Sequence, residues 1–144
     1  MYLIDTCTLS ELLRAKPAPI VMAWFAMQSP KTLFTSRVCM AEAERGVAKL
    51  SFDPKQSIRH AAMQAKVSAL LESFDGRILA ADNLVWSRWS VLMSEGDAIG
   101  KKRPELDTLI AASAAIRGFS VVTRNVHDFE GMCEIINPWE MPPP

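Results

Sequence analysis

Short apolar runs alternate with helical patterns along most of this chain, and this alternation restricts the possible fold more than any other feature. Runs typical of buried strands occur at residues 2–5, 33–35, 77–79, 119–123 and 134–136. Segments with helix signals separate most of them, at 6–14, 20–27, 38–50, 53–74, a stretch that Asp82–Asn83 can cap, and 106–117. Strands separated by helices pair in parallel, because a parallel connection needs a long crossover. The pattern predicts an α/β protein with a mostly parallel sheet covered on both faces.

The length predicts a single domain over residues 1–144 that ends in an extended tail at Pro138–Pro144. A chain of this size buries roughly 70% of the surface of its extended form, which is enough for a core of its own. Residues 96–103 contain two glycines and the cations Lys101, Lys102 and Arg103. We therefore expect a mobile loop there.

The charge balance excludes a protein that attracts nucleic acid or membrane through its overall field. Sixteen basic residues balance sixteen acidic ones, so an RNA partner needs a local basic groove. No apolar stretch approaches the ~20 residues that span a bilayer, and Met1 leads straight into a strand pattern rather than a leader. The three cysteines form no CxxC pair, which argues against a zinc site or a disulfide framework. We expect a cytoplasmic protein with no membrane partner.

Asp5 stands where the first predicted strand ends and the first helix begins. Ligands and metals bind at that edge of open α/β sheets. Glu42, Asp107 and Asp128 could complete a cation site with it. Taken singly, each acid also has a plainer role: Asp5 as a helix cap, Asp107 as a helix-dipole residue, Glu42 as a solvated side chain and Asp128 as a turn residue. Spacing alone does not separate these interpretations.

Carboxylates from separate strand ends and helix starts suit one chemistry in particular. Mg²⁺ and Mn²⁺ prefer oxygen ligands, and a phosphodiester hydrolase uses such a metal to activate water and to neutralise charge on the phosphate. In that hypothesis some of these acids hold the metal and another orients the attacking water. Thr6, at the helix start, either bonds a phosphate oxygen or an acid, or only caps the helix.

Four motifs in order resemble the PIN domain, and within it the toxins of VapBC type II toxin–antitoxin systems and their FitB-like branch. The motifs are Leu3–Thr6 followed by Ser10–Leu12, then Ala41–Gly46, Asp107–Ala112 and Val122–Phe129. Asn137–Trp139 also matches the FitB-like pattern, so the resemblance runs from residue 2 to Trp139.

The resemblance implies a three-layer α/β/α sandwich and a Mg²⁺- or Mn²⁺-dependent ribonuclease. It also implies a homodimer that a cognate antitoxin (VapB- or FitA-like) holds inactive, and operator DNA bound only through that complex. Carried onto matching positions, Asp5 and Asp107 are direct metal ligands and Glu42 completes the acidic triad, directly or through water. Thr123, Arg124 and Asn125 then border the site and contact the substrate.

Two positions depart from the family pattern. Many relatives have a fourth acid where Asn125 stands, so Asp128 either supplies the missing carboxylate or orders the loop. Cys7 stands where relatives often carry Asn; a thiol is a poor ligand for hard cations, so we expect a small packed side chain.

Candidates for a basic RNA groove are Arg37, Arg45, Lys101, Lys102, Arg103 and Arg124. For Arg124, a structural ion pair with one of the acids is the alternative to a phosphate contact. Two other functions compete with the nuclease. One is a different Mg²⁺-dependent α/β phosphohydrolase, although the stretch from Asp5 to Cys7 lacks the Asp-x-Asp of haloacid-dehalogenase phosphatases. The other is a catalytically weak PIN-like binding or scaffold module, which Asn125 favours slightly.

Overall fold

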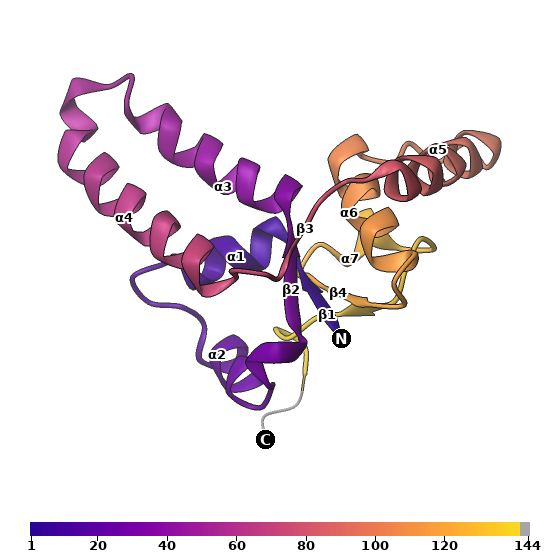
Figure 1. The fold of residues 1–144 in the computed structure, drawn as a ribbon, viewed down its shortest axis with the longest axis horizontal. Coiled ribbons are helices and arrows are strands. Elements are labelled where there is room, and N and C mark those ends of the chain that lie inside the picture. The colour runs from indigo at the N-terminus through magenta and orange to yellow at the C-terminus, as the bar shows by residue number, and fades with distance from the viewer. Residues whose placement is uncertain (142–144) are drawn as a thin grey trace.

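Five short strands form one parallel sheet in the computed structural model, which describes residues 1–141 (Figure 1). The strands are β1 (Tyr2–Ile4), β2 (Leu33–Ser36), β3 (Ile78–Leu79), β4 (Ser120–Val122) and β5 (Ile135–Ile136). Their order in the sheet is β3-β2-β1-β4-β5, and all four pairings are parallel. In the central register, Leu3 lies opposite Phe34 on one side and Val121 on the other. The parallel sheet predicted from the alternating pattern is confirmed.

Helices cover both faces of this sheet. They are α1 (Thr6–Leu12), α2 (Pro19–Ala26), α3 (Arg37–Leu50), α4 (Ser57–Ser73), α5 (Asn83–Ala98), α6 (Glu105–Ala115) and the short α7 (Val126–Phe129), with 3-10 turns at Pro30–Thr32 and Pro54–Gln56. In Figure 1, α3 and α4 form one arm and α5 and α6 a second arm, and the arms diverge from the ends of the strands. None of the helices in residues 1–141 has the length and apolar character needed to cross a membrane.

Helices α1 and α3 begin directly after β1 and β2, because a side chain at the end of each strand caps the helix that follows. The carboxylate of Asp5, next to β1, accepts a 2.8 Å hydrogen bond from the Thr8 amide. The hydroxyl of Ser36, the last residue of β2, accepts one of 3.2 Å from the Cys39 amide and so starts α3. Both side chains satisfy amides that have no partner within the helix. The carboxyl ends of β1 and β2 are therefore also the amino ends of helices.

The core lies between the central strands and the helices on their two sides. Leu3 and Ile4 of β1 and Val121 and Val122 of β4 are fully buried. Helix α6 is buried over seven consecutive residues from Thr108 to Ala114. This enclosed part of α6 begins directly after Asp107, which lies in the half-exposed first turn of the helix.

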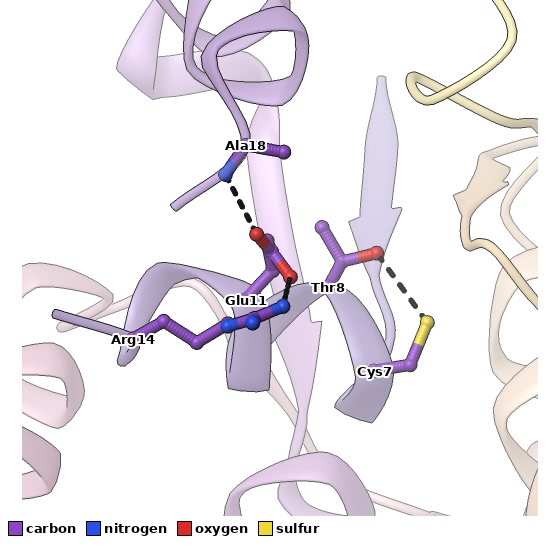
Figure 2. A network of polar contacts seen from close by, with 5 residues as sticks. All are labelled: Cys7, Thr8, Glu11, Arg14 and Ala18. Carbon is purple, nitrogen blue, oxygen red and sulfur yellow. Dashed lines mark hydrogen bonds and ion pairs between the residues drawn. The ribbon is translucent and has the colours of Figure 1, made fainter. Parts of the chain in front are cut away.

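The buried carboxylate of Glu11 fastens the connection between α1 and α2, as Figure 2 shows. Its Oε1 accepts a 2.7 Å hydrogen bond from the Ala18 amide, and its Oε2 lies 3.2 Å from Nη1 of Arg14. The Ala18 bond is the main reason why the pKa of Glu11 is lower than usual. Glu11 thus sets the point at which α2 starts.

The structure differs from the sequence-based expectations in three places. Helix α5 runs through Gly96 to Ala98, so the loop predicted to begin at residue 96 begins only after the helix. Pro104 is the N-cap of α6 and not its first residue. Helix α7, which contains Asp128, was not predicted because four residues are too few to show a helical period. The predicted tail at Pro138–Pro144 is described only as far as Met141.

Candidate active site

The path of the chain through the sheet creates a crevice between the ends of β1 and β4. From β1 the chain goes outward through β2 to β3, then crosses to β4 and continues to β5 on the other side. Neighbouring strands whose connections leave in opposite directions form a topological switch point, where open α/β sheets bind ligands. Asp5 directly follows β1 and Thr123 directly follows β4, so both residues lie at this point.

Both carboxylate oxygens of Asp5 are oriented by hydrogen bonds. The side chain is buried, with Oδ1 accepting from the Thr8 amide at 2.8 Å. Oδ2 accepts from the hydroxyl of Thr123 at 2.6 Å. Each oxygen retains a further lone pair, because a carboxylate can accept about four hydrogen bonds or ligands. Asp5 is therefore a helix cap that can also coordinate a ligand, and the two interpretations of this residue are compatible.

The other three acids reach the same region from three further elements. Glu42 lies on α3 and accepts a hydrogen bond from the Thr6 hydroxyl; Asp107 lies in the first turn of α6 and Asp128 in α7. Burial is the largest of the causes that raise the pKa of Asp107 to about 6, and the negative charges of Asp128, Glu42 and Asp5 follow in that order of size. The other three acids are thus close enough to repel the Asp107 carboxylate.

No ion pair in the described part of the chain balances this negative charge. None of the four acids takes part in an ion pair with Lys, Arg or His in residues 1–141. Over the same residues, no group of three or more His, Cys, Asp or Glu side chains is arranged to hold a metal ion. The donors are all carboxylates, which suits a hard divalent cation, although in the described residues they do not converge on one point. The residues fit Mg²⁺ or Mn²⁺ by chemistry and charge.

The segment that follows β4 is held against the start of α1. The amide of Asn125 donates to the Thr123 hydroxyl at 2.9 Å, and the Arg124 amide donates to Sγ of Cys7 at 3.3 Å. Burial and the charge of Asp5 raise the pKa of the Cys7 thiol, which favours its neutral form. Cys7 is the small, packed side chain that the sequence predicts.

A family comparison agrees with this geometry. The model of the PIN domain family matches residues 2–134. This chain belongs to the PIN domain family. The match covers all the motifs between Leu3 and Phe129 on which the resemblance rested, and it confirms that interpretation.

Two named proteins and a solved structure match this chain over nearly its full length. A protein named VapC ribonuclease Y4jK from Sinorhizobium fredii is 34% identical over 97% of this chain and 99% of its own length. Toxin FitB from Neisseria gonorrhoeae is 31% identical over 96% of this chain and 99% of its own length. The solved structure of FitAB bound to a DNA fragment superposes with a TM-score of 0.85 at 31% identity, covering 99% of this chain and 98% of that chain.

Two of the cations expected to line an RNA groove bind other residues of this PIN domain. Arg103 is 7% exposed and points into the protein, so its assignment to a substrate groove was wrong. Arg37 forms a two-pronged ion pair with Glu44, at 2.7 and 3.3 Å. Arg103 is therefore not accessible to RNA, whereas Arg37 is an exposed residue that lines the same groove as Glu42.

Other cations remain near the acids. Arg45 and Glu42 both line a groove of about 440 Å³ whose other walls are mainly apolar. The guanidinium of Arg124 lies 5.8 Å from the ring centre of Trp139, so this exposed cation stacks on an aromatic side chain and forms no ion pair with the acids. Local positive charge beside the site therefore comes from exposed residues of α3 and of the segment after β4.

Proposed function

We propose that this PIN domain is a metal-dependent endoribonuclease and the toxin of a type II toxin–antitoxin system of the VapBC or FitAB kind, acting in the cytoplasm. The observation that carries the proposal is the group of four carboxylates at the switch point of the sheet, none of which has a cationic partner within residues 1–141. Such an unbalanced group is costly unless a cation binds there. The names of the relatives, VapC ribonuclease and Toxin FitB, support the reaction and the role.

In this proposal Asp5 and Asp107 hold Mg²⁺ or Mn²⁺, and Glu42 completes the acidic triad. The metal would supply a Lewis acid that stabilises charge on the scissile phosphate and makes water a better nucleophile. The protein's own residues set the geometry: Thr123 orients Asp5, and Thr6 orients Glu42. Glu42 or Asp128 accepts hydrogen bonds from the attacking water and so directs it at the phosphorus.

The substrate contacts proposed from the sequence are Thr6, Thr123, Arg124 and Asn125. The hydroxyl protons of Thr6 and Thr123 are donated to carboxylates, which supports a role for these two in orienting the acids. Arg124 is exposed, and its amide is tied to Cys7, so its guanidinium extends from a fixed backbone position. A guanidinium in that place suits an RNA phosphate.

The partners we propose are an antitoxin, operator DNA bound through the toxin–antitoxin complex, and a second copy of this chain. The similarity to FitAB, solved on a DNA fragment, supports the first two. Helices α1, α3 and α4 enclose a groove of about 230 Å³ that includes Leu13, Val47 and Met63 and could receive an antitoxin segment. Leu84, Val91 and Ile99 expose apolar surface on and beside α5, which supports a homodimer.

The deciding experiment is Mn²⁺-dependent cleavage of total cellular RNA by purified protein. Wild type should give discrete products, whereas Asp5→Asn, Asp107→Asn and Glu42→Gln should give none. Glu44→Gln is the matched control, because Glu44 lies two residues further along α3 but pairs with Arg37 and not with the site. Mn²⁺ binding without cleavage by wild type would contradict the nuclease, and an absence of both would favour the scaffold module.

A further inference from the structure

Arg103 is a buried arginine whose partners all lie on α5. Its side chain is 5% exposed, its Nη1 donates to the carbonyl of Leu92, and the same atom lies 3.5 Å from Oε2 of Glu95. Its Nε has no hydrogen-bond partner in residues 1–141. Burying a guanidinium with one nitrogen unsatisfied is unfavourable. Stability alone therefore does not explain why Arg103 is buried at this place.

Gly96 provides the space in which Arg103 lies. A Cβ at this position would stand 2.9 Å from Cδ of Arg103 and 2.9 Å from the carbonyl oxygen of Lys101. The Lys101 amide in turn donates to the Gly96 carbonyl at 2.9 Å. The loop between α5 and α6 is thus packed directly on the backbone of α5.

A second bond joins α5 to the first residue of α6. The indole nitrogen of Trp89 donates a 3.0 Å hydrogen bond to the carbonyl of Glu105. Trp89, Leu92 and Gly96 are spaced three and four residues apart, so they lie on one face of α5. Arg103 and Glu105 are therefore held by the same helix face, two positions apart.

The contacts that Arg103 and Glu105 make with α5 lie on either side of Pro104, where α6 begins. The N-cap of α6 is Pro104, which forms no side-chain capping bond. Asp107 lies in the first turn, next to three other carboxylates that repel it. A first turn without a side-chain cap frays easily unless another element holds it.

We infer that Trp89 and Arg103 are positioning residues for Asp107: from α5 they hold the first turn of α6 so that the Asp107 carboxylate stays at the metal site. The inference rests on the proposed function, because it assigns Asp107 to that site. Arg103 acts on α6 through packing and hydrogen bonds. Its positive charge does not act directly on Asp107, because its ion-pair partner is Glu95. Neither residue needs to touch RNA or metal.

The test is Mn²⁺ binding by Trp89→Phe, measured by titration calorimetry on the full chain without RNA. The substitution keeps an aromatic ring and removes the indole N–H together with part of the ring system that packs against Trp86. The expected result is Mn²⁺ affinity weaker by about fivefold, the effect of one lost hydrogen bond, with faster hydrogen exchange in the first turn of α6. The KM for RNA should be unchanged at saturating Mn²⁺, and the cleavage rate should recover as Mn²⁺ is raised.

Ser94→Ala is the matched control. It also removes one hydrogen bond from α5, the 2.9 Å bond from the Ser94 hydroxyl to the Ser90 carbonyl, but that bond stays within the helix. Ser94→Ala should bind Mn²⁺ as wild type does. Wild-type affinity in Trp89→Phe, or equal weakening in both variants, would overturn the inference while leaving the nuclease intact. A wild-type protein that binds no Mn²⁺ would overturn the proposed function and this inference together.

Discussion

The hydroxyl of Thr123 donates a 2.6 Å hydrogen bond to Oδ2 of Asp5, although 118 positions separate the two residues in the sequence. The same hydroxyl accepts a hydrogen bond from the Asn125 amide at 2.9 Å, and Sγ of Cys7 lies 3.6 Å from it. The bond joins the ends of the two strands that flank the switch point. One threonine therefore sets both the orientation of the buried carboxylate and the course of the chain after β4.

Replacing Thr123 by Val keeps the shape of the side chain and removes this bond. We expect RNA cleavage to fall about 10- to 100-fold, the usual effect of losing a residue that orients a metal ligand. The free energy of unfolding should fall by about 1–3 kcal/mol, because buried polar groups lose their partner. Thr123→Ser retains the hydroxyl and should stay close to wild type in both assays. Wild-type cleavage by the Val variant would contradict this role.

The stability of the metal-free protein should depend on pH through Asp107. Its pKa is about 6 in the folded state against an ordinary value of 3.8, so the folded state binds the proton more tightly than the unfolded chain. The stabilisation is therefore fully present below about pH 4 and is lost as the pH rises through 6.

Comparison with Asp107→Asn isolates this effect. Between pH 4 and 7 in EDTA, wild type should lose about 1–2 kcal/mol of unfolding free energy relative to the Asn variant, allowing for solvent screening of a half-buried group. Urea denaturation at several pH values measures the difference. A constant difference across this range would show that neither burial nor the three neighbouring carboxylates raise the pKa of Asp107.

Gly96→Ala should destabilise the protein although alanine favours helices. The new Cβ meets the Lys101 carbonyl oxygen and the Arg103 side chain at 2.9 Å, and we expect a loss of about 1–3 kcal/mol from this overpacking. Gly46→Ala is the control, because no atom lies within 4 Å of a Cβ at that position of α3. That variant should gain about 0.5–1 kcal/mol. Thermal and urea unfolding of both variants test the pair, and equal signs would contradict the prediction.

Glu11→Ala removes the acceptor of the Ala18 amide and should lower the unfolding free energy by about 1–3 kcal/mol. Arg14→Ala removes only an exposed partner of the same carboxylate, so a loss of at most about 1 kcal/mol is expected. Because the pKa of Glu11 is lowered, its contribution is present above about pH 4.5 and is lost as the pH falls. Denaturation at pH 7 and at pH 3 should show the two variants converging with wild type at the lower pH.

Several features of the fold follow from local sequence alone. The alternation of strands and helices predicts the parallel sheet, and Asp5 after the first strand predicts the helix start that it caps. These features depend on neighbours within a few residues, where periodicity and capping act. The ordered motifs likewise predict the family without knowledge of any contact.

The environment of individual side chains depends on the tertiary structure. Arg103 follows two lysines and looks like part of a basic loop, yet Gly96 leaves room for it inside the protein. Asp128 likewise lies near Asp107 only because the segment after β4, which contains α7, runs back toward α6. Local sequence determined which segments became strands, helices and caps, since those choices are made by short-range backbone interactions. The packing of segments far apart in the chain decided which acids meet and which cations remain exposed, because burial and charge–charge distance exist only after the sheet has assembled.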